Sequence, residues 1–437
     1  MEGSSLKSYE EKTPGSKALF ERAKRVLPAG VSYGIRDITP YPFFVAEAKG
    51  CKLTDVDGNV YTDYWTGHGA LILGHSHPRV MDAVEEQIRK GTHIGFSHGL
   101  EIELAERLVE MVPSAEMVRY TSSGTEANMY SSRLARAYTG RMNLVKMEGG
   151  WHGGYDSLHK GVHEPYNVPE SAGLNPKTVE DTVVVPFNDL DAARKALKGE
   201  DAASLVVEPL MGVGGFLLPE PGYLEGLREI CDETGTLLVF DEVISGFRLG
   251  PGGGQEYFGV TPDITVLGKI MGGGFPIGAF CGRRDIFERL DHRKYPEMQE
   301  RSFHGGTFTG NPVSMVAGIV TLDILKEGKV YEHIDGLGEK VRRGLADIID
   351  RSDVDAALTG VCSTFGIHFQ KEVPKNVREV TRNDPKVARA YYAHMLSRNI
   401  VYVSPTLPHS FVGEPHTEGD IEEFLTATED FFKTYKG

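Results

Sequence analysis

Through the middle of the chain, short apolar segments alternate with longer segments of helical periodicity. In the longer segments apolar residues recur roughly every three to four positions, which is typical of an amphipathic helix. Strands that alternate with such helices favour a mostly parallel sheet covered by helices on both faces, an α/β fold. The expected helices are Pro78–Lys90, Leu100–Met111, Glu126–Tyr138 and Tyr223–Thr234, and the expected strands are Met117–Thr121, Met142–Lys146, Thr182–Val185, Ser204–Val207, Leu237–Phe240 and Ile264–Val266.

Both ends of the chain depart from this pattern. Residues 42–63 are typical of a small antiparallel meander, with Asp57-Gly58 as its hairpin turn. Because 437 residues are too many for one ordinary core, we expect a large central domain over residues 76–330 and a smaller α+β domain formed by residues 1–75 and 331–437. The expected C-terminal elements are helices Leu337–Ile349 and Pro385–Arg398 and strands near Phe365–Phe369 and Val401–Val403, and the glycine clusters Gly250–Gly254 and Gly272–Gly274 are expected to form loops.

Composition narrows the possible partners. The formal net charge is −15, and such a surface repels nucleic acid and anionic membranes, so neither is an expected partner. The N-terminal segment has no apolar core of a signal peptide, and no stretch is long and apolar enough for a membrane helix. The four cysteines lack CxxC spacing, which indicates reduced core thiols. These features predict a soluble, cytoplasmic protein.

An acid and a lysine follow two successive apolar strands. Asp241 directly follows Leu237–Phe240, and Lys269 follows Ile264–Val266 after Leu267-Gly268. In a parallel sheet, ligands bind at the carboxyl ends of the strands, where a carboxylate can pair with a cationic heterocycle and a buried lysine becomes a usable amine nucleophile. The alternatives are a metal-binding or Walker B acid and a lysine that reaches solvent; the nucleotide alternative fails because no P-loop or GxGxxG spacing is present.

Two loops rich in glycine and hydroxyl groups precede helices. Ser122-Ser123-Gly124-Thr125 offers free amides, hydroxyls and a helix N-terminus to a phosphate, although ordinary N-capping explains the same residues. The second loop is His304–Pro312. Between them, Trp151 lies in a glycine-rich segment where it could stack on a heteroaromatic ring or belong to a turn.

In order, the segments SSGTEA, GGWHGGYD, VEP, FDEVISGFR, DITVLGKIMGGG and GGTFTGNP resemble the motifs of the class III, fold-type I pyridoxal-phosphate aminotransferase family, and most closely those of glutamate-1-semialdehyde 2,1-aminomutases. The resemblance covers nearly the whole chain. It implies a large lobe with a seven-stranded type of sheet, a smaller lobe from both chain ends, pyridoxal 5′-phosphate as cofactor, and a homodimer with shared active sites.

Carried over by position, the resemblance implies a role for each motif residue. Lys269 would carry the cofactor as a Schiff base and serve as general base and acid, and Asp241 would pair with the pyridine nitrogen. The remaining implied roles are phosphate binding by Ser123, Gly124 and Thr125, with Thr307 from the partner subunit; ring contacts by Trp151 and Val243; a position near the ring oxygen for Glu208; and substrate-carboxylate binding by Arg36.

The histidines do not predict a metal site. His68, His75, His77, His93 and His98 cluster in sequence, but no HExxH motif or acid-rich cluster completes a site. No metal is therefore expected, and capping or subunit contacts are the expected roles.

The chain departs from the aminomutase pattern at positions expected to face the substrate. Trp151 replaces the usual tyrosine, the residues in 64–69 and 94–98 differ, Leu158–Pro176 is not the usual Gly/Ser-rich gating loop, and Thr406–Phe411 lacks the usual carboxylate. The expected activity is aminomutase-like amino transfer. The alternatives are an intermolecular transaminase that uses a β- or ω-amino acid or amine and a keto-acid acceptor, a racemase or epimerase, and a non-catalytic cofactor-binding protein.

Overall fold

The computed structural model describes residues 2–402 and 408–435 of the chain. The described chain divides into two compact units. Unit 1 contains residues up to His77, Glu332–Val373 and the residues from Val380 onward, and unit 2 contains Pro78–Tyr331 and Pro374–Glu379. Unit 1 is thus built from both ends of the chain, and unit 2 takes most of the middle.

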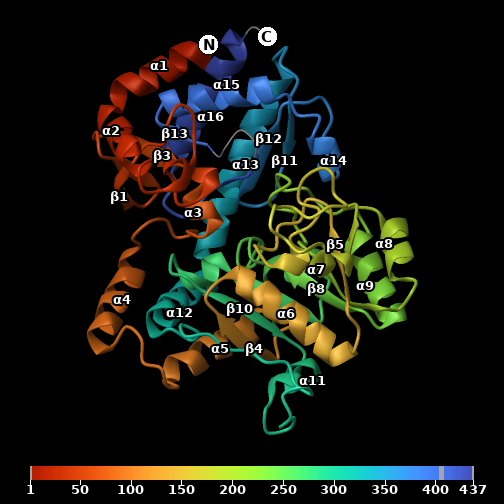
Figure 1. Cartoon of the computed structure of the whole chain (residues 1–437). Coiled ribbons are helices and arrows are strands. Elements are labelled where there is room, and N and C mark those ends of the chain that lie inside the picture. Colours follow the sequence, from red (N-terminus) through yellow and green to blue (C-terminus); the bar gives the residue numbers. More distant parts are fainter. Residues whose placement is uncertain (1, 403–407, 436–437) are drawn as a thin grey trace. The chain divides into compact units, whose positions relative to one another are not determined.

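A seven-stranded sheet forms the centre of unit 2 (Figure 1). Its strand order is β4-β10-β9-β8-β7-β5-β6, and only β10 runs antiparallel to its neighbours. The carboxyl ends of the six other strands therefore share one edge of the sheet. The strands are β4 (Met117–Thr121), β5 (Asn143–Met147), β6 (Thr182–Val185), β7 (Ala202–Val207), β8 (Leu237–Asp241), β9 (Ile264–Gly268) and β10 (Gly278–Gly282).

The central strands are fully buried because they carry apolar side chains on both faces. Helix α6 (Gly124–Thr139) packs across β7, β9 and β10 (Figure 1). Its buried face includes Ala127 and Leu134, which join the core formed by the sheet. The other helices of unit 2 are α4 (Pro78–Lys90), α5 (Gly99–Met111), α7 (Pro176–Glu180), α8 (Leu190–Leu197), α9 (Tyr223–Thr234), α10 (Gly253–Phe258), α11 (Arg284–Phe287) and α12 (Pro312–Lys326).

Unit 1 contains two small sheets. One has the order β1-β2-β3-β13, in which β13 pairs parallel to β3, and the other has the order β11-β12-β14. The strands are β1 (Val45–Lys49), β2 (Lys52–Asp55), β3 (Val60–Asp63), β11 (Ala357–Thr359), β12 (Thr364–His368), β13 (Ile400–Val401) and β14 (Ser410–Phe411). The helices include α1 (Glu2–Lys12), α2 (Pro14–Ala23), α3 (Thr66–Gly69), α13 (Lys329–Asp350), α14 (Val377–Val380), α15 (Pro385–Ser397) and α16 (Glu418–Thr434), of which α13 and α14 extend across a unit boundary.

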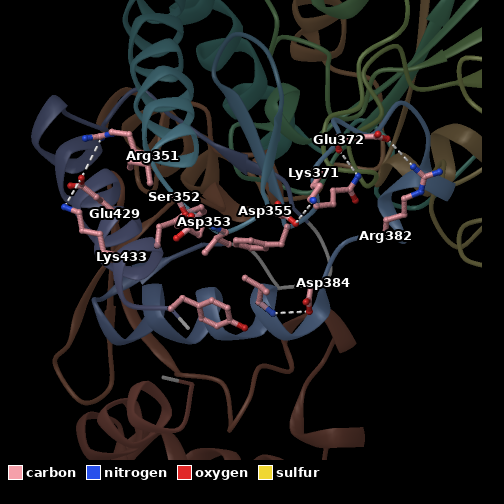
Figure 2. Close-up of a pocket in the computed structure, with 17 residues that line it drawn as sticks. Arg351, Ser352, Asp353, Asp355, Lys371, Glu372, Arg382, Asp384, Glu429 and Lys433 are labelled. Carbon is pink, nitrogen blue, oxygen red and sulfur yellow. Dashed lines mark hydrogen bonds and ion pairs between the residues drawn. The ribbon is translucent and has the colours of Figure 1, made fainter. Parts of the chain in front are cut away.

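Unit 1 also has a hollow of about 1000 Å³ (Figure 2). Ion pairs occupy its rim, among them Lys433 with Glu429 and Arg382 with Glu372. Phe369 and Phe432 contribute apolar surface to its lining. None of the cofactor residues expected from the sequence lines this hollow.

The expected α/β fold is confirmed, and most expected elements occur within a few residues of their predicted bounds. Some elements were not expected, among them strand β10 and the helices α8, α12 and α16. The glycine cluster Gly250–Gly254 runs into helix α10 instead of remaining a loop. Residues 403–407 lie outside the described residues, so the expected strand end at Val403 and the altered positions Thr406 and Leu407 do as well.

Candidate active site

Four chain segments leave the sheet of unit 2 at its carboxyl edge and carry expected site residues. Asp241 is the last residue of β8, and Lys269 follows β9 directly. Glu208 follows β7, and Ser123 lies two residues beyond the end of β4. Because these strands are parallel, the four side chains start from the same edge of the sheet.

Asp241 is held by three donors. Its Oδ2 accepts hydrogen bonds from His152 Nδ1 at 2.7 Å and Asn128 Nδ2 at 2.8 Å. Its Oδ1 accepts only the amide of Val243, at 3.1 Å, among the described residues. Burial favours the neutral acid, since Asp241 is 3% exposed, but the hydrogen bond and charge of His152, with the other donors, lower the pKa of Asp241 below its ordinary value. The carboxylate is therefore ionised, and its Oδ1 has room for one more donor.

His152 is a site residue that the sequence reasoning missed. Burial lowers the pKa of His152, although the hydrogen bond to Asp241 opposes the shift. We therefore take the pair as neutral imidazole and carboxylate, with the Nδ1 proton donated to Asp241. The Nε2 atom of His152 is buried and has no hydrogen-bond partner among the described residues. Asn128 was missed too, and its only signal was its place three residues after Thr125 in the expected phosphate-binding helix.

Lys269 lies half-buried with an amine that forms no hydrogen bond or ion pair to a described residue. Its backbone has φ +47°, a left-handed conformation that is uncommon for a side-chain-bearing residue and is concentrated at functional sites. Burial lowers the pKa of Lys269, while the charges of Asp241 and Glu208 act in the opposite direction. A larger fraction of this amine is therefore neutral, and nucleophilic, than of an exposed lysine.

Glu208 fixes the backbone of Trp151. Its Oε1 accepts the Trp151 amide at 3.0 Å, and its Oε2 accepts the Gly212 amide at 3.1 Å. Burial, followed by the charge of Asp241, raises the pKa of Glu208 to about 7, and these two amides and Lys269 limit the rise. The ring of His159 meets the Trp151 ring edge-on, with centroids 5.5 Å apart.

The N-terminus of α6 offers unpaired amides. Ser123 caps the helix by accepting the Glu126 amide at 3.2 Å, whereas the amides of Gly124 and Thr125 have no partner among the described residues. Such amides, together with the helix dipole, favour an anion. A phosphate fits this end of the helix.

Val243, two residues after β8, lies between the start of α6 and the end of β9. A side chain added at Gly124 would approach Val243 Cγ2 to 2.9 Å, and one added at Gly268 would approach Val243 Cγ1 to 3.4 Å. Val243 therefore contacts both the helix start and the residue before Lys269. The structure brings together Ser123, Gly124, Thr125, Trp151, Glu208, Asp241, Val243 and Lys269 in unit 2.

Two expected site residues are not part of this cluster. Thr307 lies exposed in a turn of unit 2 and forms no hydrogen bond to the cluster within the described chain. Arg36 belongs to unit 1, where its Nη1 donates to Ser32 Oγ at 3.1 Å. Glu242, the acid beside Asp241, is used locally, because its oxygens accept the amides of Gly254 and Gln255.

The chemistry of this cluster fits pyridoxal phosphate. The ligand needs an amine for attachment, an acceptor for its ring nitrogen and donors for its phosphate. Lys269 supplies an unpaired amine, Asp241 Oδ1 an available acceptor, and the amides of Gly124 and Thr125 unpaired donors. By contrast, the described residues contain no group of three or more His, Cys, Asp or Glu side chains arranged to hold a metal ion.

The sheet order and the lysine and aspartate at its carboxyl edge define the class of fold-type I aminotransferases. Residues 33–407 match the aminotransferase class-III family model. The chain therefore belongs to the class III aminotransferase family.

The relatives agree with this family over almost the whole chain. A glutamate-1-semialdehyde 2,1-aminomutase of Methanothrix thermoacetophila is 44% identical over 96% of both chains. An omega-transaminase from Sphaerobacter thermophilus superposes with a TM-score of 0.89 at 33% identity, covering 96% of this chain and 97% of that one. A glutamate-1-semialdehyde aminomutase from Pseudomonas aeruginosa has a TM-score of 0.90 at 25% identity, covering 98% and 96%.

These comparisons confirm the expected family, the fold-type I architecture and membership of an enzyme family. Among the described residues, no helix has the length and apolarity needed to cross a membrane. All four cysteines are free thiols.

Proposed function

We propose that the chain is a pyridoxal-phosphate enzyme that moves an amino group within one substrate, with the activity of a glutamate-1-semialdehyde 2,1-aminomutase. The observation that carries the proposal is the unpaired, half-buried amine of Lys269 beside the ionised Asp241 at one sheet edge. The aminomutase relative at 44% identity supports the substrate class.

Each group of the cluster has a defined task in this reaction. The bound cofactor supplies an electron sink for the bond broken beside the amino group. Asp241 would keep the ring nitrogen protonated, because its carboxylate is ionised and buried. Ser123, Gly124 and Thr125 would hold the phosphate, Trp151 and Val243 would contact the ring, and Glu208 would lie near the ring oxygen.

Lys269 would hold the bound cofactor through its amine and would act as proton carrier when that amine is free. It would take the proton from the amine-bearing carbon of the substrate and return it within the same site. Burial lowers the pKa of this amine, which favours the neutral, proton-accepting form.

Substitution of the lysine tests the central assignment. In Lys269→Ala we expect kcat to fall by roughly 10²–10⁴-fold, the contribution of a positioned acid–base group, and the absorbance of the lysine-bound cofactor to disappear. Stopped assays and an absorbance spectrum measure both. Survival of both signals in the variant would refute the assignment.

A second candidate is an intermolecular transaminase. The omega-transaminase structure at 33% identity and TM-score 0.89 favours it, as does Trp151 in place of the tyrosine usual in the aminomutases. A larger indole beside the ring changes the space that the substrate occupies. This candidate shares every role assigned to Lys269 and Asp241.

A donor–acceptor screen separates the two candidates. We expect glutamate 1-semialdehyde to be converted to 5-aminolevulinate by the purified enzyme with no added keto acid. A strict requirement for a keto-acid acceptor, with β- or ω-amino acids or amines as donors, would instead establish the transaminase.

Three expectations complete the proposal. We place Arg36 at the substrate carboxylate, and Thr307 at the phosphate of a second copy of the chain in a homodimer. Arg36→Ala should raise KM for the acidic substrate more than it lowers kcat.

Mixing inactive Lys269→Ala with Thr307→Ala subunits tests the shared site. Only a mixed dimer contains one site in which Lys269 and Thr307 are both unaltered. The proposed compartment is the cytoplasm.

A further inference from the structure

Lys146 is a completely buried cation that no role in the proposed reaction uses. It lies on β5, between β7 and the edge strand β6, and is 0% exposed. Its Nζ donates to three backbone carbonyl oxygens: Gly150 at 2.7 Å, Leu158 at 3.0 Å and Lys160 at 2.8 Å. A protonated lysine has three N–H groups, so every donor has one acceptor.

The three acceptors all belong to one segment. We call residues 149–160 the strap, since this segment leaves the end of β5 and returns over Lys146. The strap carries Trp151, whose amide reaches Glu208, and His152, whose ring reaches Asp241. Lys146 thus binds the strap near its start and at its far end, on either side of the two residues that reach the site.

Among the described residues, the carbonyl oxygens of Gly150 and Leu158 accept no hydrogen bond other than that of Lys146. Outside its short 3-10 turn, Asp156–Leu158, the strap has no regular secondary structure. Without Lys146, the carbonyl oxygens of Gly150 and Leu158 would lose a buried donor, and an unsatisfied buried polar group costs on the order of 1–3 kcal/mol. The strap would then move to regain hydrogen bonds.

The protonation of Lys146 is sensitive to its surroundings. Burial lowers the pKa of Lys146 to about 7, while the charges of Glu208, Glu170 and Asp241 favour the ammonium. His152 is the other ionisable group that interacts with it. The amine loses one of its three N–H groups as the pH rises through this pKa, and one carbonyl of the strap then faces a lone pair.

We propose that Lys146 is a positioning residue whose ammonium holds the strap, and with it Trp151 and His152, at the carboxyl edge of the sheet. The proposal concerns the strap itself and does not depend on the substrate. Its kinetic consequence rests on the proposed function.

Fluorine NMR can follow the strap directly. The chain has two tryptophans, Trp65 and Trp151, so 5-fluorotryptophan gives two signals, and Trp65→Phe assigns them. In the cofactor-loaded Lys146→Met enzyme we expect the Trp151 signal to shift and broaden while the Trp65 signal stays in place. An unchanged Trp151 signal in the folded variant overturns the proposal.

Lys160 provides the matched control. It lies at the end of the strap, but its Nζ donates to Val179 at 3.1 Å and Thr182 at 2.7 Å, which are outside the strap. Its carbonyl oxygen, the one that Lys146 contacts, is retained in Lys160→Met. We expect this variant to leave the Trp151 signal unchanged, and an equal response in both lysine variants also overturns the proposal.

A second measurement covers the case in which Lys146→Met does not fold. With lysine retained at position 146, the Trp151 signal should change as the pH rises through the Lys146 pKa of about 7. Glu208 and the ring of His159 are also ionisable neighbours of Trp151, so the series is repeated in the double variant Glu208→Gln with His159→Phe. A Trp151 signal that is independent of pH in this double variant contradicts the proposal.

Kinetic measurements distinguish a failure of the Lys146 proposal from a failure of the proposed function. If the amino-transfer activity exists, Lys146→Met should lower kcat by roughly 10–100-fold, the cost of a misplaced site group, and Lys160→Met should not. If the unaltered protein shows no amino transfer, the proposed function fails while the fluorine result still decides the role of Lys146.

Discussion

At the scale of single residues, the two oxygens of Asp241 have different surroundings. His152 and Asn128 both donate to Oδ2, which leaves Oδ1 with a single backbone amide. The side chain donors therefore fix the orientation of the carboxylate and lower its pKa, and they leave Oδ1 available for the proposed cofactor contact. The neighbouring acid, Glu242, is fully occupied by its own loop.

We expect Asp241→Asn to lower kcat by roughly 10²–10³-fold, as loss of a preorganised charge at a reacting group does. The amide has nearly the same shape but cannot hold a proton on the ring nitrogen. Steady-state kinetics measures the loss. Glu242→Gln is the control, and it should reduce thermal stability with a much smaller change in kcat; equal losses in kcat would contradict the assignment.

His152→Phe tests how the pKa of Asp241 is held low. Burial raises this pKa and His152 lowers it, so removal of the histidine should raise it. Activity that needs the ionised carboxylate is lost as the pH falls through the pKa. The acid limb of the kcat profile should therefore move to higher pH in His152→Phe, and an unmoved limb would show that His152 has no such effect.

The sequence indicated Asp241 and Lys269 because each directly follows an apolar strand, where a charged residue is conspicuous. It did not indicate His152, because a histidine between a tryptophan and a glycine has no pattern of its own. Its contact with Asp241 is apparent only in the fold, where the loop after β5 lies against the end of β8. These two segments are far apart in the chain.

At the scale of elements, the start of α6 and the strap are packed against each other. A side chain added at Gly153 would lie 2.0 Å from Thr125 Oγ1, and Gly153 has φ +81°. Glycine is therefore required both for the backbone conformation and for the close approach. This contact couples the position of the strap to the expected phosphate-binding residues.

Gly153→Ala should consequently weaken cofactor binding. We expect the dissociation constant for the cofactor to rise about tenfold or more, corresponding to about 1.4 kcal/mol, because Thr125 must move. Equilibrium titration of the apoenzyme measures this. Gly154→Ala is the matched control, since an added side chain there meets no atom within 4 Å; similar constants for both variants would contradict the prediction.

Glycine also explains which elements the sequence did not reveal. Strand β10 begins and ends with glycine, and such a composition is typical of loops. A side chain added at Gly278 would lie 2.2 Å from the carbonyl oxygen of Ser123. A side chain added at Gly282 would lie 2.3 Å from the carbonyl oxygen of Asp263. Packing against neighbouring backbone requires these glycines. Helix α10 was missed for a related reason, since Gly253 and Gly254 lie against Glu242.

At the scale of the whole molecule, the chain enters and leaves unit 2 twice. The short segment Pro374–Glu379 belongs to unit 2 although the residues on both sides belong to unit 1. Within unit 2, Arg378 binds the buried Glu148 through two hydrogen bonds of 2.7 and 2.6 Å. We propose that the two units are the two domains expected from the sequence and that this ion pair fastens the segment.

Arg378→Met should destabilise the protein by about 1–2 kcal/mol, because the carboxylate of Glu148 would remain buried without its charged donor. Urea unfolding measures the change. Arg382→Met is the control, since the Arg382–Glu372 pair is exposed and such pairs contribute roughly 0–1 kcal/mol. Equal effects of the two substitutions would show that burial of Glu148 is unimportant.

The discontinuity of unit 1 has a consequence for synthesis on the ribosome. Its first 77 residues emerge before any of unit 2, but their partners in the same unit begin only at Glu332. The strand pair β3 and β13 joins Thr62 with Ile400, so that sheet cannot be completed until almost the whole chain has been translated. The N-terminal residues of unit 1 are therefore synthesised long before the strand that completes their sheet.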